Sequence, residues 1–195
     1  MALEWQPSAQ AWLHHLSIAF IVRSRKCRFM SIPEFEVRPE YPEDAEKLKS
    51  LAVRSFGPGR FTRTAHRIRE KGLPVDALSL TAWAGSEFAG SIRFTAISIG
   101  SETGALLLGP LMVEEKWSGQ GCGRALVRRG LELAREAGSA LVILVGDRPY
   151  YEQFGFVPVT PGQMIFPGPV DPARLLAVEL EEGALGRFSG VVMAE

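Results

Sequence analysis

Residues 106–156 read LLLGPLMVEEKWSGQGCGRALVRRGLELAREAGSALVILVGDRPYYEQFGF. The almost unbroken apolar run Leu106–Val113 is typical of a strand that is buried on both faces. Gly109-Pro110 interrupts this run, and proline cannot donate a hydrogen bond to a sheet ladder. We therefore expect strand pairing to fail or to bulge at this point, which would leave backbone N–H and C=O groups available to a ligand.

A glycine-rich turn follows this strand. Residues 117–124 read WSGQGCGR, with glycine at the alternate positions 119, 121 and 123, and glycine permits positive φ and the close approach of a ligand. The next segment predicts a helix that ends at Gly138, and its apolar or small stripe comprises Leu126, Gly130, Leu133, Ala134 and Ala137. A glycine turn that opens a helix presents unpaired N–H groups and the positive end of the helix dipole, so it favours phosphate or pyrophosphate.

Two common phosphate-binding motifs do not fit this turn. A Walker loop requires Gly-Lys-Ser/Thr, whereas Gly123 is followed by Arg124-Ala125. The dinucleotide fingerprint G-x-G-x-x-G would place its third glycine at Arg124 or Leu126, depending on where it starts. Both nucleotide-binding classes are therefore excluded at this turn.

The turn Ser118-Gly119-Gln120-Gly121-Cys122-Gly123 resembles the pyrophosphate loop of the GNAT N-acetyltransferases, Gln/Arg-x-x-Gly-x-Gly/Ala, with Ser118 where the family usually has Gln or Arg. Residues 150–156, YYEQFGF, resemble a second family segment, Phe/Tyr-Tyr-x-x-Phe/Leu-Gly-Phe. Four further segments are similar to the YhbS-like branch of this superfamily: GPGRF at 57–61, LGPLMV at 108–113, VGD at 145–147 and PGPVDP at 167–172. The resemblance spans roughly Phe35–Gly190.

The resemblance implies an α+β (α/β layered) GNAT fold, with a mixed, mostly antiparallel sheet flanked by helices. The residue pattern agrees with that order. It predicts a strand at 35–38, helices at 42–56 and 60–71, strands at 78–84 and 87–99, and an edge strand at 175–180. The basic stretch 60–71 has two interpretations, a solvated helix face or a surface beside the acceptor site.

The resemblance also implies acetyl-CoA as co-substrate, with no metal. Main-chain groups of Leu111, Met112 and Val113 are expected to pair with the pantetheine arm, and one N–H to face the thioester oxygen. The pyrophosphate would lie against the turn residues Ser118, Gly119, Gln120, Gly121, Cys122, Gly123 and Arg124. Tyr151 matches the family's general acid, which protonates the departing thiolate, while Tyr150 is expected to be its more buried structural twin.

The general base stays open at this point. Asp147 follows a strand and is a candidate, with capping of the next turn as the alternative. Glu114 and Glu115 are expected on the surface. Cys122 lies at a helix N-terminus, which can lower a thiol pKa, but the family has small apolar residues at this position, so we favour a space-filling role.

The function implied is transfer of an acetyl group to a primary amine of a small molecule or a peptide. The alternative is a catalytically silent GNAT-fold module that binds acyl-CoA as a regulatory ligand. The acceptor, the acyl-chain preference and the oligomeric state are not determined by the sequence, although homodimers are common in the superfamily.

The amino-acid composition bears on possible partners, on the cellular compartment and on metal binding. The 195 residues carry equal numbers of basic and acidic side chains, so net charge gives no reason to expect a nucleic acid partner. Cys27 and Cys122 are far apart and unlike in context, which favours a reducing cytoplasm. The histidines lie outside the central stretch, so we expect no zinc site.

The first thirty residues differ from the rest of the chain. Their apolar run, Trp12–Val22, is too short to span a bilayer, which takes about 20 residues, and its basic flank follows rather than precedes it, unlike a signal peptide. We expect residues 1–30 to be a loosely packed extension and 31–195 to form a single GNAT domain. The alternative for this segment is an amphipathic helix lying on a membrane surface.

Overall fold

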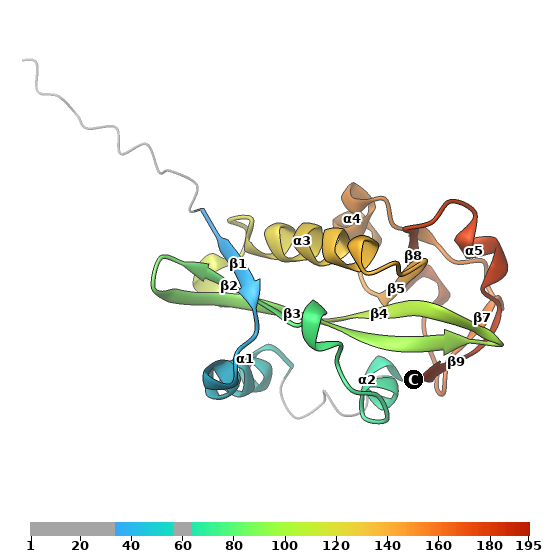
Figure 1. Ribbon diagram of the computed structural model, residues 1–195, viewed down its shortest axis with the longest axis horizontal. Helices are drawn as coiled ribbons and strands as arrows, with labels where there is room; N and C mark the ends of the chain where they lie inside the picture. The colour runs from blue at the N-terminus through green and yellow to red at the C-terminus, as the bar shows by residue number, and fades with distance from the viewer. Residues whose placement is uncertain (1–33, 57–63) are drawn as a thin grey trace, which may run out of the picture. The chain divides into compact units, whose positions relative to one another are not determined.

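A meander of three antiparallel strands, β2 (Leu80–Ala84), β3 (Glu87–Ile99) and β4 (Glu102–Val113), forms the centre of the sheet (Figure 1). The computed structural model describes residues 34–56 and 64–195. β1 (Glu36–Pro39) extends the meander antiparallel to β2, and β5 (Leu141–Val145) runs parallel to β4. This mixed, mostly antiparallel sheet confirms the predicted fold class.

The strands that follow β5 join the sheet in two places, beside β5 and beside β3. β8 (Leu175–Glu179) lies antiparallel between β5 and the short β6 (Val157–Pro158). β9 (Gly190–Ala194) pairs with the far half of β3 and runs parallel to β7 (Met164–Ile165). The strand predicted at 175–180 therefore exists, but its prediction as an edge strand is wrong, because β6 covers part of its outer edge.

Helices cover both faces of the sheet (Figure 1). α1 (Ala45–Phe56), which follows a 3-10 turn at Pro42–Asp44, and α2 (Thr64–Arg69) lie on one face. α3 (Cys122–Glu136) and α4 (Arg148–Tyr151) lie on the other, and the short α5 (Ala184–Arg187) contacts β8. Of the second predicted helix, 64–69 is helical; the preceding 57–63 and the extension 1–30 lie outside the described residues.

The packing of α3 confirms part of the predicted stripe and corrects the rest. The buried residues of α3 are Cys122, Leu126, Val127, Gly130, Leu131 and Ala134. Ala137, expected on the buried stripe, is exposed, and Leu133 is half-buried. A Cβ at Gly130 would lie only 2.6 Å from the ring of Phe94, so glycine lets the helix approach β3 closely. The last helical residue is Glu136, and Gly138, the glycine predicted to end the helix, follows it with a φ of 77°.

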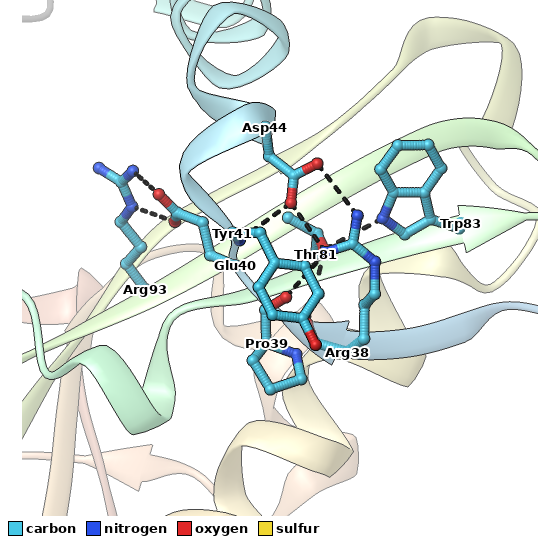
Figure 2. A network of polar contacts seen from close by, with 8 residues as sticks. All are labelled: Arg38, Pro39, Glu40, Tyr41, Asp44, Thr81, Trp83 and Arg93. Carbon is cyan, nitrogen blue, oxygen red and sulfur yellow. Dashed lines mark hydrogen bonds and ion pairs between the residues drawn. The ribbon is translucent and has the colours of Figure 1, made fainter.

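A polar network fastens β1 to the start of α1 (Figure 2). The carboxylate of Asp44, whose residue is 1% exposed, accepts hydrogen bonds from Arg38 Nη1 at 2.8 Å and Nη2 at 3.0 Å, and from the Tyr41 backbone N–H. The guanidinium of Arg38 lies over the rings of Tyr41 and Trp83. Burial alone would raise the pKa of Asp44, but these hydrogen bonds and the charge of Arg38 outweigh it and hold that pKa below its ordinary value.

Candidate active site

Strand β4 parts from β5 after Leu107. The two strands pair in parallel from Ala105 to Leu107. β5 continues to Val145, where its pairing is with β8. From Leu108 to Val113, no strand in the described chain pairs with the second edge of β4. This edge therefore leaves backbone groups beside β5 without a ladder partner.

The Gly109-Pro110 step explains why the strands part. The register between β3 and β4 shifts between Ile92 and Phe94, so that Arg93 faces the two residues of this step. Gly109 has a φ of 118°, which a residue with a side chain rarely adopts. Such a bulge bends its strand, and the failure or bulging of strand pairing predicted at this dipeptide is confirmed.

A cavity of about 880 Å³ opens where the strands part. Its walls come from β3, β4, β5, α1, α2, α4 and the segment 169–174. Leu111, one of the predicted cofactor-binding residues, lines it, as does Tyr151. Met112 instead buries its side chain against Leu48 and Leu51 of α1, so that only its backbone remains to serve a ligand. Val113 packs against the core on the α3 side.

The glycine turn opens α3 as predicted. Gly119 and Gly121 have φ angles of 73° and 102°, and the first helical backbone bond runs from the Ala125 N–H to the Gly121 carbonyl at 3.0 Å. The helix itself supplies no acceptor for the N–H groups of its first turn. Cys122, Gly123 and Arg124 occupy that turn, so their N–H groups are suited to hold an anion.

The side chains of the turn have distinct surroundings. Ser118 is exposed. The side-chain amide of Gln120 donates to the Lys116 carbonyl at 2.6 Å. A Cβ at Gly121 would lie 3.4 Å from Arg124 Nη2, so the Arg124 guanidinium folds back toward the turn. This arrangement supports a cationic contribution from Arg124. At Ser118, any contact with the pyrophosphate would have to come from a short hydroxyl group.

Cys122 is fully buried between α3 and the sheet. Its residue is 0% exposed, and it belongs to the core cluster that contains Phe94 and Leu126. Burial raises the pKa of its thiol to about 12, which is the reverse of what a helix N-terminus would do to an accessible thiol. The structure therefore favours the space-filling role for this side chain.

Tyr150 and Tyr151 both line the cavity from α4. Their rings meet edge to face at 4.9 Å, and Tyr151 also contacts Phe156. Both are half-buried, so the expectation that Tyr150 is the more buried of the two is not confirmed. The Tyr150 hydroxyl lies against the glycine turn, only 2.5 Å from where a Cβ at Gly123 would stand.

Both phenols are held in their protonated form. Burial raises the pKa of Tyr151 well above its ordinary value, Tyr150 and Asp147 add to the rise, and the charge of Arg69 opposes it. Burial also raises the pKa of Tyr150, with Arg124 opposing. A phenol in this state can donate a proton at neutral pH.

Asp147 does not cap the following turn through its side chain. It is exposed, and its carboxylate pairs with Arg174 Nη2 at 3.1 Å, at the edge of the cavity. Glu115 is exposed as expected, whereas Glu114 is only 24% exposed and pairs with Arg54 at 2.6 Å.

Several cavity residues were not predicted individually from the sequence. His66 and Arg69 come from α2, Arg93 from β3, and Asp171 and Arg174 from the carboxyl-terminal segment. Arg93 is clamped by Glu40, with Nε 2.8 Å from Oε2 (Figure 2). His66 and Arg69 are three positions apart on a basic helix, a spacing that puts both on one face. This spacing is the feature of the sequence from which the two residues could have been predicted. One of the two interpretations of the basic stretch 60–71 was a surface beside the acceptor site.

Neither a membrane span nor a metal centre is found among the described residues. No described helix is both long enough and apolar enough to cross a bilayer. Within 34–56 and 64–195, no three His, Cys, Asp or Glu side chains gather as a metal would require.

Comparison with known proteins finds similarity to acetyltransferases of the GNAT type. Residues 77–158 match the family model for the acetyltransferase (GNAT) domain. The chain is 35% identical to the uncharacterized N-acetyltransferase YhbS of Escherichia coli over 121 residues, which cover 62% of this chain and 72% of YhbS. A second E. coli relative, the uncharacterized N-acetyltransferase YjhQ, is 29% identical over 72% of this chain and 78% of its own length.

Solved structures share the architecture. The crystal structure of E. coli YhbS in complex with CoA superposes with a TM-score of 0.69 at 29% identity, over 83% of this chain and 89% of that one. A GNAT acetyltransferase from Brucella melitensis in complex with acetyl-CoA gives a TM-score of 0.52 at 29% identity, over 78% and 98% of the two chains. With its parted strands, its glycine turn and these relatives, the chain belongs to the GNAT family of N-acetyltransferases.

Proposed function

We propose that this protein transfers the acetyl group of acetyl-CoA to a primary amine of a small molecule or a peptide. The observation that carries the proposal is the parting of β4 from β5, which leaves an unpaired strand edge near both the glycine turn and Tyr151. The relatives from E. coli and B. melitensis were solved with CoA and acetyl-CoA, respectively, and this supports the same donor here.

The edge of β4 suits an amide-bearing chain such as pantetheine. An extended ligand can add to an exposed strand edge through main-chain hydrogen bonds. Leu111, Met112 and Val113 present that edge, and Pro110 marks where its N–H groups are interrupted. An N–H of this edge would stabilise the negative charge that develops on the thioester oxygen.

The reaction requires one bond to form and one to break. The amine nitrogen attacks the thioester carbonyl carbon, the C–S bond then breaks, and the electron pair leaves with sulfur. The thiolate takes a proton from the Tyr151 hydroxyl, and the proton lost by the amine passes to water. Tyr151 is suited to its part because it is protonated at neutral pH and lines the cavity.

Calorimetric titration with acetyl-CoA and with CoA is the first test. Micromolar binding of both, followed by acetylation of at least one amine in a broad panel, is the expected result. Binding without acetylation of any amine would instead favour the regulatory acyl-CoA module, for which the exposed Ser118 in place of a family Gln or Arg leaves room. Absence of binding would contradict both.

A further inference from the structure

Arg69 reaches from α2 into the cavity that Tyr151 lines. Its helix is anchored by Ile68, which is 2% exposed, and by Thr64, whose hydroxyl donates to the Pro169 carbonyl at 2.6 Å. Arg69 Nη2 donates to the Leu108 carbonyl at 3.3 Å. The guanidinium therefore lies against the backbone of β4 at the residue where β4 has just left β5.

Gly109 leaves the space that this guanidinium occupies. A Cβ at position 109 would lie 2.6 Å from Arg69 Nη2 and 3.4 Å from its Cζ. Position 109 therefore requires glycine for two reasons, its φ of 118° and the close approach of Arg69. The bulge and the arginine form one arrangement, although they come from distant parts of the chain.

The charge of Arg69 also acts on Tyr151. Besides burial, which raises the pKa of this phenol most, Tyr150 of α4 and Asp147 just before α4 raise it, and Arg69 lowers it. Other charged or titratable groups around the cavity are His66, Arg93, Asp171 and Arg174. Among these, Arg93 pairs with Glu40 and Arg174 pairs with Asp147.

We propose that Arg69 is a positioning residue for acetyl transfer, one that holds the β4 bulge through the Leu108 carbonyl and stabilises the negative charge left on Tyr151 when its proton goes to the thiolate. The proposal rests on the proposed function. It gives the arginine a role in turnover beyond fastening α2 to the sheet. A positive charge that acts on a half-buried acid is in place before the reaction begins, so it stabilises the developing negative charge without rearrangement.

Arg69→Gln is the decisive variant, because it removes the charge and keeps a polar side chain with an N–H donor, although on a shorter stem than the arginine that donates to the Leu108 carbonyl. Arg69→Lys, which keeps the charge on a different geometry, is expected to recover part of the loss. The matched control is Arg67→Gln: Arg67 lies on the same helix and also donates to a backbone carbonyl, that of Pro167 at 3.4 Å, but it is exposed and does not line the cavity.

The expected result separates turnover from binding. Arg69→Gln should lower kcat by about tenfold, a fraction of the 10²–10⁴ that general acid catalysis contributes, with CoA affinity and the thermal midpoint close to those of the parent protein. Arg67→Gln should change none of these. Activity is followed as thiol release from acetyl-CoA in the presence of the amine that the panel identifies.

A double-mutant cycle with Tyr151→Phe provides the readout that a merely structural role would not move. In the Tyr151→Phe background, Arg69→Gln should cost less than about twofold in kcat, because the acid whose charge it stabilises is gone. Effects that multiply in full, or an Arg69→Gln variant as active as the parent, would overturn the inference. Failure of the parent protein to bind acetyl-CoA or to acetylate any amine would instead overturn the proposed function.

Discussion

At the scale of single residues, two features of the site depend on one side chain each. In the proposed function Tyr151 supplies the proton that the thiolate needs, and Gly123 leaves space for the Tyr150 hydroxyl at the first turn of α3. The neighbouring Tyr150 connects them, since it contacts the Tyr151 ring and its hydroxyl lies against Gly123. A substitution of Tyr151 tests the general acid, and a substitution of Gly123 tests the anion site.

Replacing Tyr151 with Phe should lower kcat by about 10²-fold or more, because the substitution removes the general acid and keeps the packed ring. CoA affinity, measured by calorimetry, should stay within error of the parent protein. Tyr150→Phe is the matched control and should have the smaller effect on kcat. Equal losses in the two variants would argue against Tyr151 as the acid.

Replacing Gly123 with Val should abolish measurable CoA binding. The new Cβ would stand 2.5 Å from the Tyr150 hydroxyl, so either the tyrosine or the start of α3 must move. Gly186→Ala is the control, since a Cβ there meets nothing within 4 Å. A Gly123→Val variant that is folded by circular dichroism and binds CoA normally would rule out this turn as the pyrophosphate site.

At the scale of elements, β1 and α1 are joined by the network around Asp44 (Figure 2). The carboxylate is almost fully buried, while its partner Arg38 is 24% exposed. Asp44 therefore depends on these hydrogen bonds to stay ionised away from water. Because the same junction carries Glu40, which clamps Arg93 at the cavity, its stability also bears on the site.

Asp44→Asn should lower the free energy of unfolding by about 2 kcal/mol near neutral pH, the range for hydrogen bonds to charged groups. The pKa of Asp44 is lower in the folded state than in the unfolded state. Its stabilising contribution is hence present above the unfolded-state pKa and is lost as the pH falls through the folded-state value.

Urea denaturation of the two proteins across acidic and neutral pH tests this. The difference between them should shrink as the pH falls. Glu181→Gln, which removes an exposed partner of Arg187, is the control and should leave the urea midpoint unchanged. A constant difference between Asp44→Asn and the parent at all pH values would mean that the carboxylate's charge is not what stabilises the junction.

At the scale of the whole molecule, the described residues, 34–56 and 64–195, already contain every residue predicted for the site. The division into an extension at 1–30 and a single domain at 31–195 stays a prediction, as do the cytoplasmic location and a homodimer. A polypeptide that begins at Met30 tests the first of these directly.

The shortened chain should keep the thermal midpoint and the CoA affinity of the full chain, because every site residue that the structure describes lies within 34–195. Binding of both proteins to vesicles that contain anionic lipid should also be equal under the extension hypothesis. Stronger binding by the full chain would favour the amphipathic membrane helix instead.

The sequence predicted the local parts of the site well. The strand, the glycine turn, the helix and the tyrosine pair are contiguous from 106 to 156, and each follows from short-range rules of periodicity, glycine conformation and proline chemistry. The break at Gly109-Pro110 was predicted for the same reason. Identification of the family followed because its two motifs lie in this one stretch.

What only the tertiary structure decided involves segments far apart in the chain. The parallel pairing of β4 with β5, the insertion of β8 between β5 and β6, and the pairing of β9 with β3 are choices of strand neighbour, and burial makes those choices rather than local pattern. The burial of Val127 and Leu131 likewise depends on the surface that α3 covers. Arg69 donates to the Leu108 carbonyl and its charge acts on Tyr151, although these residues are far apart in the sequence, so no periodicity could bring the three groups together.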